Sequence, residues 1–312
     1  MQMKQMLPGR GFCGYLIYTV AVLLLMLWLQ FPAAAVKAKA EAELNQLTPG
    51  LEWQIGTIGL TLPADIRFGQ IKVSGKGEKE PLVRAESLTL RPDFFNWRSW
   101  SALYRLQLLG GSVSGRLGLS KDRSGLEYSG ELQGIRFDSP DFKKLLEGYD
   151  RTVSGTLSGN FTGRSAGQQG LFAELQGSFK VGKGAISLQA PVLGMDQIAF
   201  ETISSTIKRR AGAVQIEGGK LESRLLAAEF SGDLRLTEPV ASSSIRLKVS
   251  LNPRPELMAS VGSPMLINLL KGQLKNDKLP FTVTGTLNAP GIVFNGLPAD
   301  FNQQLQGRSG QP

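Results

Sequence analysis

The stretch EFSGDLRLTEP, residues 229–239, carries the pattern that decides the fold. Phe230, Gly232 and Leu234 alternate with Ser231 and Asp233. Because residues two apart in a β-strand share a face, this order puts two apolar side chains and a glycine on one face and polar side chains on the other. One buried face and one wet face are typical of an antiparallel sheet.

The same five-residue pattern, apolar-polar-glycine-polar-apolar, recurs along the chain. Copies stand at residues 113–117 (VSGRL), 128–132 (YSGEL), 153–157 (VSGTL), 175–179 (LQGSF) and 283–287 (VTGTL). Their spacing is irregular, which indicates a loose repeat rather than a strict solenoid. We predict that the strands carrying these copies share one continuous sheet, with their apolar positions on its concave side.

A glycine between two apolar residues on a buried face has two interpretations. It can mark a bulge, a bend or a space that a large side chain from the facing sheet fills. Alternatively, the glycines form notches in an apolar trough that takes acyl chains or an extended segment of a partner protein. The candidate trough residues are Val113, Gly115, Leu117, Val153, Gly155, Leu157, Leu175, Gly177, Phe179, Phe230, Gly232, Leu234, Val283, Gly285 and Leu287.

The composition is that of a folded protein built largely from strands. The chain has 312 residues, of which 42% are hydrophobic and 20% charged, a balance that favours a packed core over disorder. After the N-terminal segment, strand signals dominate, and only residues 91–103, 139–149 and 254–274 break the alternation, the last two as short helices. The predicted fold is mainly β: an elongated, curved antiparallel sheet folded on itself, a few short helices and one N-terminal transmembrane helix.

The N-terminal segment is apolar over the thickness of a bilayer. Residues 12–31, FCGYLIYTVAVLLLMLWLQF, contain no charged side chain, and about 20 helical residues span the hydrocarbon core. A signal peptide cleaved near the alanines at 33–35 is the alternative, but its apolar region is usually shorter. The expected division is 1–11 cytoplasmic stub, 12–33 transmembrane anchor, 34–48 juxtamembrane helix, 49–296 β domain and 297–312 flexible tail, with the N-terminus inside and the β domain outside the membrane.

The residue inventory argues against the commonest catalytic sites. The chain has no histidine and a single cysteine, Cys13, which excludes Ser-His-Asp and Cys-His arrangements, CxxC zinc clusters and intrachain disulfides. No phosphate-binding loop has the required spacing. Glu127, Glu131 and Asp233 occupy outward strand positions, where solvated acids are common. We therefore expect no enzymatic activity, no cofactor and no bound metal.

The formal net charge is +9 and the isoelectric point is near 9.7, but the basic residues are scattered among acids. This distribution does not predict a nucleic-acid partner. The densest basic run is Lys208-Arg209-Arg210. Its simplest interpretation is a solvated hairpin tip, and the alternative is a patch that faces anionic lipid head groups or an acidic partner.

A family resemblance rests on the order of several segments after the N-terminal span. These are EWQIGTIGLTLPADIRFGQIKVSG (52–75), LQLLGGSVSGRLGLS (106–120), AELQGSFKVGKGAISL (173–188), GKLESRLLAAEFSGDLRL (219–236) and LPFTVTGTLNAPGI (279–292). In this order they resemble the GspN family of bacterial type II secretion systems, in its AsmA-like form. The resemblance covers about residues 10–296.

The resemblance implies a protein anchored by one span in the bacterial inner membrane, with a periplasmic AsmA-like β domain. As a GspN-like protein it would be a non-catalytic accessory component of type II secretion, with other secretion components and inner-membrane lipid as partners. The wider AsmA-like group implies an alternative, lipid binding or lipid transfer between the inner and outer membranes, with acyl chains in the trough. The resemblance supplies no catalytic residues.

Overall fold

The computed structural model describes residues 10–48, 50–61, 65–77, 80–93, 100–120, 125–145, 151–165, 173–192, 195–210, 212–237, 242–260, 272, 274 and 276–294. It is mainly β, with four helices in the described ranges: α1 (Arg10–Leu29), α2 (Ala33–Leu47), α3 (Pro140–Leu145) and α4 (Pro255–Ser260). The strands are β1 (Leu51–Thr61), β2 (Asp65–Gly75), β3 (Pro81–Pro92), β4 (Ser101–Leu108), β5 (Gly111–Leu119), β6 (Leu126–Arg136), β7 (Arg151–Val153), β8 (Thr156–Arg164), β9 (Glu174–Val192), β10 (Met195–Arg210), β11 (Ala213–Glu222), β12 (Leu226–Arg235), β13 (Ser244–Pro253), β14 (Leu279–Thr286) and β15 (Pro290–Phe294).

All fifteen strands belong to one antiparallel sheet, which confirms the prediction of a single sheet. Strands that follow one another in the sequence are neighbours in the sheet, except that the short β7 pairs with β9. Each strand therefore hydrogen-bonds to the strands made just before and after it. Such local pairing keeps the loop-closure entropy of each step small.

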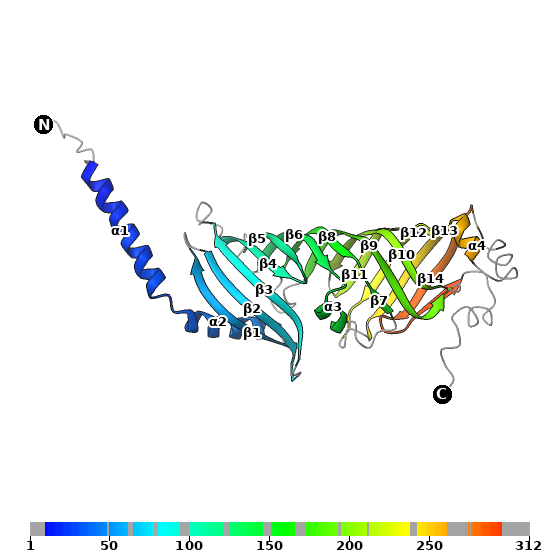
Figure 1. Cartoon of the computed structure of the whole chain (residues 1–312), viewed down its shortest axis with the longest axis horizontal. Helices are drawn as coiled ribbons and strands as arrows, with labels where there is room; N and C mark the ends of the chain where they lie inside the picture. The colour runs from blue at the N-terminus through cyan, green and yellow to red at the C-terminus, as the bar shows by residue number, and fades with distance from the viewer. Residues whose placement is uncertain are drawn as a thin grey trace.

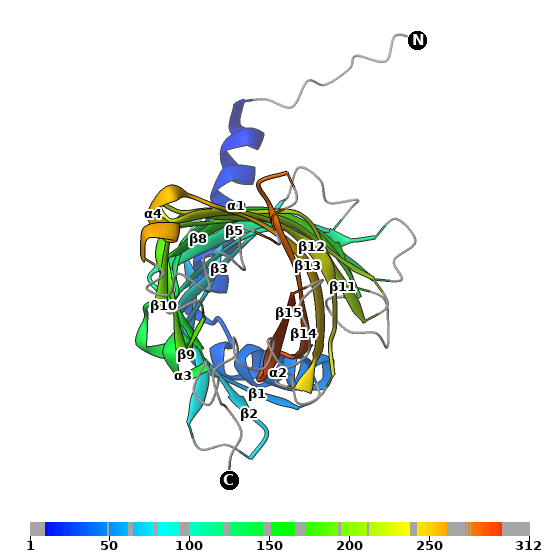
Figure 2. The same ribbon diagram turned by 90° about the vertical axis from the view of Figure 1, so that its right-hand side faces the viewer.

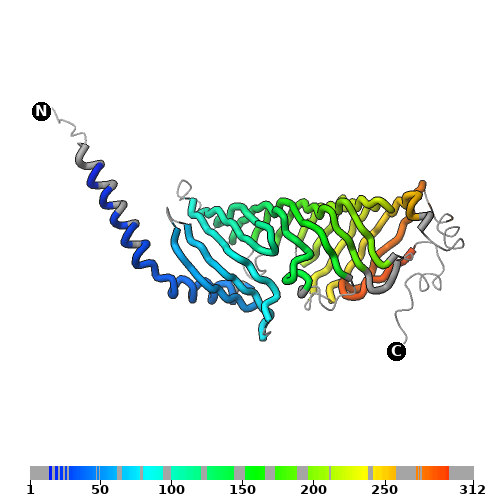
Figure 3. The backbone as a smooth tube through the Cα atoms, in the orientation of Figure 1, coloured from blue at the N-terminus to red at the C-terminus, as the bar shows by residue number. Residues whose placement is uncertain are grey.

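The sheet is elongated and curved. β1 to β4 lie at one end of the long axis and β13 to β15 at the other (Figure 1), and the backbone winds from end to end without returning (Figure 3). Viewed along this axis, the strands curve around a central direction, and α2 lies on the inner side of β1 and β2 (Figure 2). One face of the sheet is thus turned inward along its length.

The N-terminal helices are separate elements. α1 ends at Leu29, and α2 begins at Ala33 after Pro32, whose fixed backbone is suited to the start of a new helix. Within the ranges that the structure describes, no helix combines the length and apolar character required to cross a membrane. The membrane span over 12–33 stays a prediction.

α2 protects the first edge of the sheet. The backbone N–H of Trp53 donates to Asn45 Oδ1 at 2.8 Å, and that of Ile55 donates to Glu41 Oε1 at 2.7 Å. These helix side chains accept from the β1 edge, which would otherwise offer its donors to another chain. Two backbone donors on the outer edge of β1 are therefore satisfied by α2.

Two hydrophobic clusters of buried residues lie near the two ends of the sheet. The first combines residues of β1 to β3, including Ile55 and Ile71, with Ala40 and Leu44 of α2. The second combines residues of β12 to β15, such as Leu226, with Leu257 of α4. Each end of the inward face is thus packed against a helix.

The alternation of faces is interrupted in β1 to β3. Ile55 and Ile58 are both on the packed side although they are three residues apart, and Ile71 and Phe68 of β2 repeat the same step. Gln70, between them, has a φ of 53°, the left-handed region that is rare for residues other than glycine. The regular pairing of β1 with β2 and of β2 with β3 is therefore interrupted there.

The predicted helices and loops have mixed outcomes. The helix expected within 139–149 is α3, and Ser139 Oγ accepts from the Phe142 N–H at 3.3 Å as an N-cap. Of the helices expected in 254–274, the structure describes α4, while residues 261–271 lie outside the described residues. The centre of the aromatic segment 91–103 and the tail 297–312 also lie outside them.

Candidate apolar binding face

The centres of four glycine motifs line up across the sheet. Gly115 of β5 is directly opposite Gly130 of β6, and Phe161 of β8 stands between Gly130 and Gly177 of β9. Across β10 and β11, the same row continues to Gly232 of β12. We call this the centre row, and it consists of Tyr104, Gly115, Gly130, Phe161, Gly177, Ile207, Ile216, Gly232, Leu247, Val283 and Ile292.

The apolar members of the motifs form two further rows on the same face. The Arg209 row consists of Ala102, Leu117, Tyr128, Gly163, Leu175, Arg209, Val214, Leu234, Ile245 and Gly285. The Phe179 row consists of Leu106, Val113, Leu132, Gly159, Phe179 and Ser205, and continues with Phe230, Val249, Phe281 and Phe294. The three rows together are called the apolar face.

The apolar face is the inward one. Leu106 of the Phe179 row belongs to the same hydrophobic cluster as Ala40 and Leu44 of α2, and α2 lies on the inner side of the curved sheet (Figure 2). Phe281 and Ile292 likewise belong to the cluster at the far end. The sequence prediction that the motif residues lie on the concave side is therefore confirmed for the copies on β5, β6, β9 and β12.

Two motif copies differ from the prediction. Residues 153–157 do not form one strand, because β7 ends at Val153 and β8 begins at Thr156. Gly155 between them has a φ of 131°, and its carbonyl accepts from the Phe137 N–H at 3.0 Å. In the last copy Gly285 also has a positive φ, 111°, and Leu287 lies beyond β14. Gly155 stands at a break between two strands, and Gly285 lies near the end of a strand. Both have a backbone conformation that only glycine adopts without strain.

The glycines are not open notches, which corrects the interpretation of the trough. A Cβ added at Gly130 would lie 2.7 Å from the Phe161 ring and would overlap the Tyr104 hydroxyl. At Gly163 it would meet the ring of Tyr128. Aromatic side chains from neighbouring strands therefore cover these glycines, from within the same sheet rather than from a facing one.

At other motif positions the backbone itself occupies the space. A Cβ at Gly232 would overlap the carbonyl oxygen of Arg246 on β13, and one at Gly115 would overlap the carbonyl oxygen of Ser129 on β6. At Gly177 the obstacles are the Asn160 carbonyl at 2.6 Å and the Phe179 ring at 2.8 Å. Glycine is required here for close approach between strongly curved strands.

The middle of the apolar face is apolar yet not buried. Side chains of β5 to β10 in the three rows remain partly exposed, in contrast to the buried clusters at the ends. The large ones are Val113, Leu117, Leu132, Phe161, Leu175, Phe179 and Ile207. A sheet face of this kind exposes apolar surface that a monomeric soluble protein usually covers.

Arg209 is the one charged side chain in the three rows. It stands between Leu175 of β9 and Val214 of β11. Its Nε is buried, and no described residue accepts a hydrogen bond from it. The prediction of a solvated hairpin tip holds for the position of Lys208-Arg209-Arg210 at the end of β10, but Arg209 itself lies on the apolar face.

Two tyrosines accompany Arg209 on this face. Burial raises the pKa of Tyr104, with a smaller contribution from Tyr128, and the Tyr104 hydroxyl donates to the Ser129 carbonyl at 3.2 Å. Burial also raises the pKa of Tyr128, which the nearby Arg209 cation partly offsets. Both phenols are therefore neutral at physiological pH.

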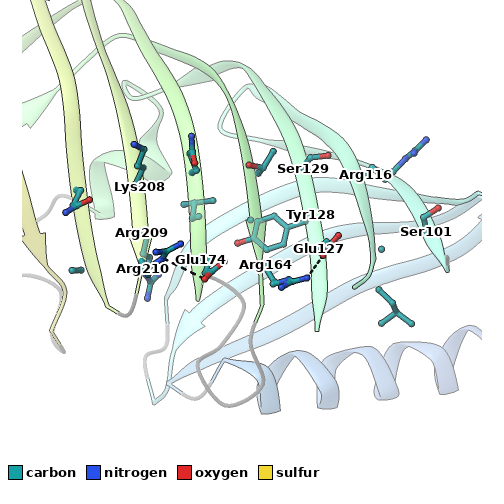
Figure 4. A pocket seen from close by; sticks show the side chains of 18 residues that line it. Ser101, Arg116, Glu127, Tyr128, Ser129, Arg164, Glu174, Lys208, Arg209 and Arg210 are labelled. Carbon is teal, nitrogen blue, oxygen red and sulfur yellow. Dashed lines mark hydrogen bonds and ion pairs between the residues drawn. The ribbon is translucent and has the colours of Figure 1, made fainter. Parts of the chain in front are cut away.

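The opposite face is polar and ion-paired. An open cavity of about 1230 Å³ runs along the strand ends from β4 to β11 and is lined from both faces, by Ser129 and Lys208 of the polar face and by Tyr128 and Arg209 of the Arg209 row (Figure 4). Arg164 pairs with Glu127 at 2.7 Å, and Arg210 approaches Glu174 at 3.9 Å. Such exposed pairs stabilise little and leave no uncompensated charge.

The carboxylates considered in the sequence are distributed as expected. Glu127, Glu131 and Asp233 lie opposite polar or glycine neighbours on the polar face, and Glu127 is engaged by Arg164. Within the described residues, no group of three or more Cys, Asp or Glu side chains has an arrangement that could hold a metal ion. The arrangement on the apolar face offers binding surface and one cation.

Two further features of the site have a signal in the sequence. Residues 157–161, LSGNF, repeat the motif directly after the interrupted copy, and Gly159 indeed lies in the Phe179 row. Arg209 stands two residues after Ile207, so strict alternation along β10 places it on the apolar face. The alignment of the glycines into one row had no signal in the sequence, because it depends on the register of every hairpin.

Comparison with known proteins gives no further identification. No known protein family, no curated protein and no solved structure matches this chain.

Proposed function

We propose that the protein binds the acyl chains of lipids on its apolar face and performs no chemistry there. The observation that carries this proposal is the contrast along the inward face. Its ends are buried against α2 and α4, whereas the apolar side chains of β5 to β10 stay partly exposed. Exposed apolar surface is removed from water at a gain of roughly 25 cal/mol per Å², so a hydrocarbon ligand is the natural complement.

The shape of the face suits chains rather than compact ligands. The three rows cover five consecutive residues of each strand, roughly 13 Å at the usual rise of a strand. The centre row and the Arg209 row continue from β4 to β14 through direct pairs of residues, whereas the Phe179 row is interrupted at the bulge in β11. A long and narrow apolar strip on the inner side of a curved sheet supports the assignment of an AsmA-like form, which we include in the proposal.

We also propose that α1 anchors the protein in the bacterial inner membrane, with the N-terminus inside and the β domain in the periplasm. The described apolar side chains of α1 are largely exposed: Tyr15, Tyr18, Leu23, Leu25, Met26, Trp28 and Leu29. A helix with this many exposed apolar residues requires an apolar surrounding. A lipid ligand would then be available next to the binding face.

The alternation of faces supplies the control for the test. A benzophenone amino acid at Phe161 places a photoreactive group on the apolar face, and the same residue at Asn160 places it on the polar face of the same strand. After irradiation of cells and purification, lipid adducts are expected at position 161 and not at 160. Equal adducts at both positions, or none at 161, would contradict acyl-chain binding on this face.

A second candidate function follows from the family resemblance, participation in type II secretion through binding of a strand-forming protein segment. The observation that favours it is the other edge of the sheet. β15 pairs with β14, and its exposed Val293 lies in this last strand of the described sheet. Edge strands accept a further strand from a partner. Crosslinks from position 293 to a secretion component, together with reduced secretion in a strain lacking the protein, would support it.

A further inference from the structure

Arg209 is an unusual residue on the apolar face. Its neighbours across the sheet are Leu175 and Val214, and its neighbours on the same side of β10 are Ile207 and Ser205. Its Nε is buried without a hydrogen-bond acceptor among the described residues. A donor N–H buried without an acceptor is unfavourable, so the protein alone leaves this guanidinium incompletely hydrogen-bonded.

The two adjacent basic residues behave differently. Lys208 Nζ lies 2.7 Å from Glu217 Oε2, and Arg210 is 86% exposed beside Glu174. Both lie on the polar face, where Glu217 pairs with Lys208 and Glu174 lies close to Arg210. Of these three consecutive basic residues, Arg209 is therefore the one that has no acidic partner among the described residues.

We propose that Arg209 binds the phosphate of an anionic glycerophospholipid whose acyl chains lie along the apolar face. The proposal rests on the function proposed above and specifies its ligand. A guanidinium presents its donors in a planar fork that matches a phosphate, and such charge-assisted bonds are strongest away from water. The roughly 13 Å width of the three rows is wider than one hydrocarbon chain, which favours a lipid with two chains over a single-chain fatty acid.

The position of Arg209 on the apolar face determines where the headgroup and the acyl chains of the lipid would lie. It lies on β10, four strand spacings from β5, or roughly 19 Å at the usual separation of strands. The intervening positions of its own row are Leu175, Gly163, Tyr128 and Leu117. Chains that extend from a headgroup at Arg209 toward β5 would therefore lie over an uncharged surface, with the glycine at 163 covered by the Tyr128 ring.

The test uses the full chain in a lipid-free detergent, with native mass spectrometry to follow added lipid. The probes are dioleoyl phosphatidylglycerol, dioleoyl phosphatidylcholine and palmitate. Arg209→Gln removes the charge on the apolar face, Arg209→Lys keeps it without the fork, and Lys208→Gln removes a charge on the polar face. Melting temperatures of all variants confirm that they are folded.

We expect Arg209→Gln to weaken phosphatidylglycerol binding at least about tenfold, the usual effect of losing a hydrogen bond to a charged group. Phosphatidylcholine carries the same phosphate beside a choline cation that offsets its charge, so its binding should weaken less than that of phosphatidylglycerol. Arg209→Lys should lie between wild type and Arg209→Gln, and Lys208→Gln should bind as the wild type does. Equal phosphatidylglycerol binding by wild type and Arg209→Gln overturns the proposal, as does an equal loss in Lys208→Gln or preferential, Arg209-dependent binding of palmitate.

These outcomes are distinct from failure of the proposed function. If the wild type binds neither phospholipid, acyl-chain binding itself is wrong. If it binds both equally and Arg209→Gln has no effect, acyl-chain binding stands and only the role of Arg209 fails.

Discussion

Lys208 and Arg209 are adjacent in the sequence and lie on opposite faces of the sheet. Lys208 pairs with Glu217 on the polar face, whereas Arg209 is placed between Leu175 and Val214 on the apolar face with its Nε buried. The alternation of side chains along a strand produces this separation. It makes the pair a matched set for experiments, because the same change at either position alters one face only.

Replacement of Arg209 by methionine should stabilise the protein. The change removes a buried polar group without an acceptor, whose cost is about 1–3 kcal/mol, and methionine fills the apolar surrounding. For a domain of this size the melting temperature should rise by about 2–4 °C per kcal/mol. Lys208→Met is the control and should change it little. A lower melting temperature for Arg209→Met would show that Arg209 makes stabilising contacts within the protein.

Substitution of a motif glycine should destabilise the sheet even when the new side chain is small. Gly232→Ala places a Cβ against the Arg246 carbonyl of β13, and the strands must separate to admit it. We expect a loss of about 1–3 kcal/mol in the free energy of unfolding, measured in urea. Gly59→Ala in β1 is the control, because its Cβ would meet nothing within 4 Å, and it should be neutral or gain up to about 1 kcal/mol. Equal effects at both positions would contradict close approach at Gly232.

The cover of Gly163 by Tyr128 can be tested with a double-mutant cycle. The three atoms nearest to a Cβ at Gly163 would all belong to the Tyr128 side chain, so Gly163→Ala should be destabilising in the wild type and nearly neutral in a Tyr128→Ala background. The expected coupling lies within the usual range of about 0.5–3 kcal/mol for residues in contact. Additive effects on the free energy of unfolding would mean that another atom occupies the space.

The Asp65–Arg91 pair predicts a pH dependence of stability. Arg91 Nε donates to Asp65 Oδ1 at 2.8 Å, and this hydrogen bond lowers the pKa of Asp65 below its usual value of 3.8. Because the folded state holds the carboxylate more strongly, its contribution is complete above pH 3.8 and is lost as the pH falls through the lowered pKa. Asp65→Asn should therefore lower the melting temperature at pH 7 and have little effect near pH 2. A pH-independent difference would assign the effect to packing.

The sequence by itself determined the class of fold and the face that each motif residue occupies. Alternation with period two is a local property of the chain, so Phe230 and Leu234 could be placed on one face without knowledge of any neighbour. The same local reasoning extends to Arg209, which follows Ile207 by two residues. It fails where a glycine changes the backbone direction, as at Gly155, where the motif spans the end of β7 and the start of β8.

The tertiary structure alone decided which residues meet across the sheet. The centre row exists because each pair of strands has a particular register, set by the length of its turn and by bulges such as the one at Gly218 and Gly219 in β11. A shift of one residue between β5 and β6 would have separated Gly115 from Gly130, and a shift between β9 and β10 would have separated Leu175 from Arg209. The sequence therefore specified a sheet with one apolar face, and the accumulated registers of its strands brought Gly130 and Gly163 under aromatic rings and placed one cation on that face.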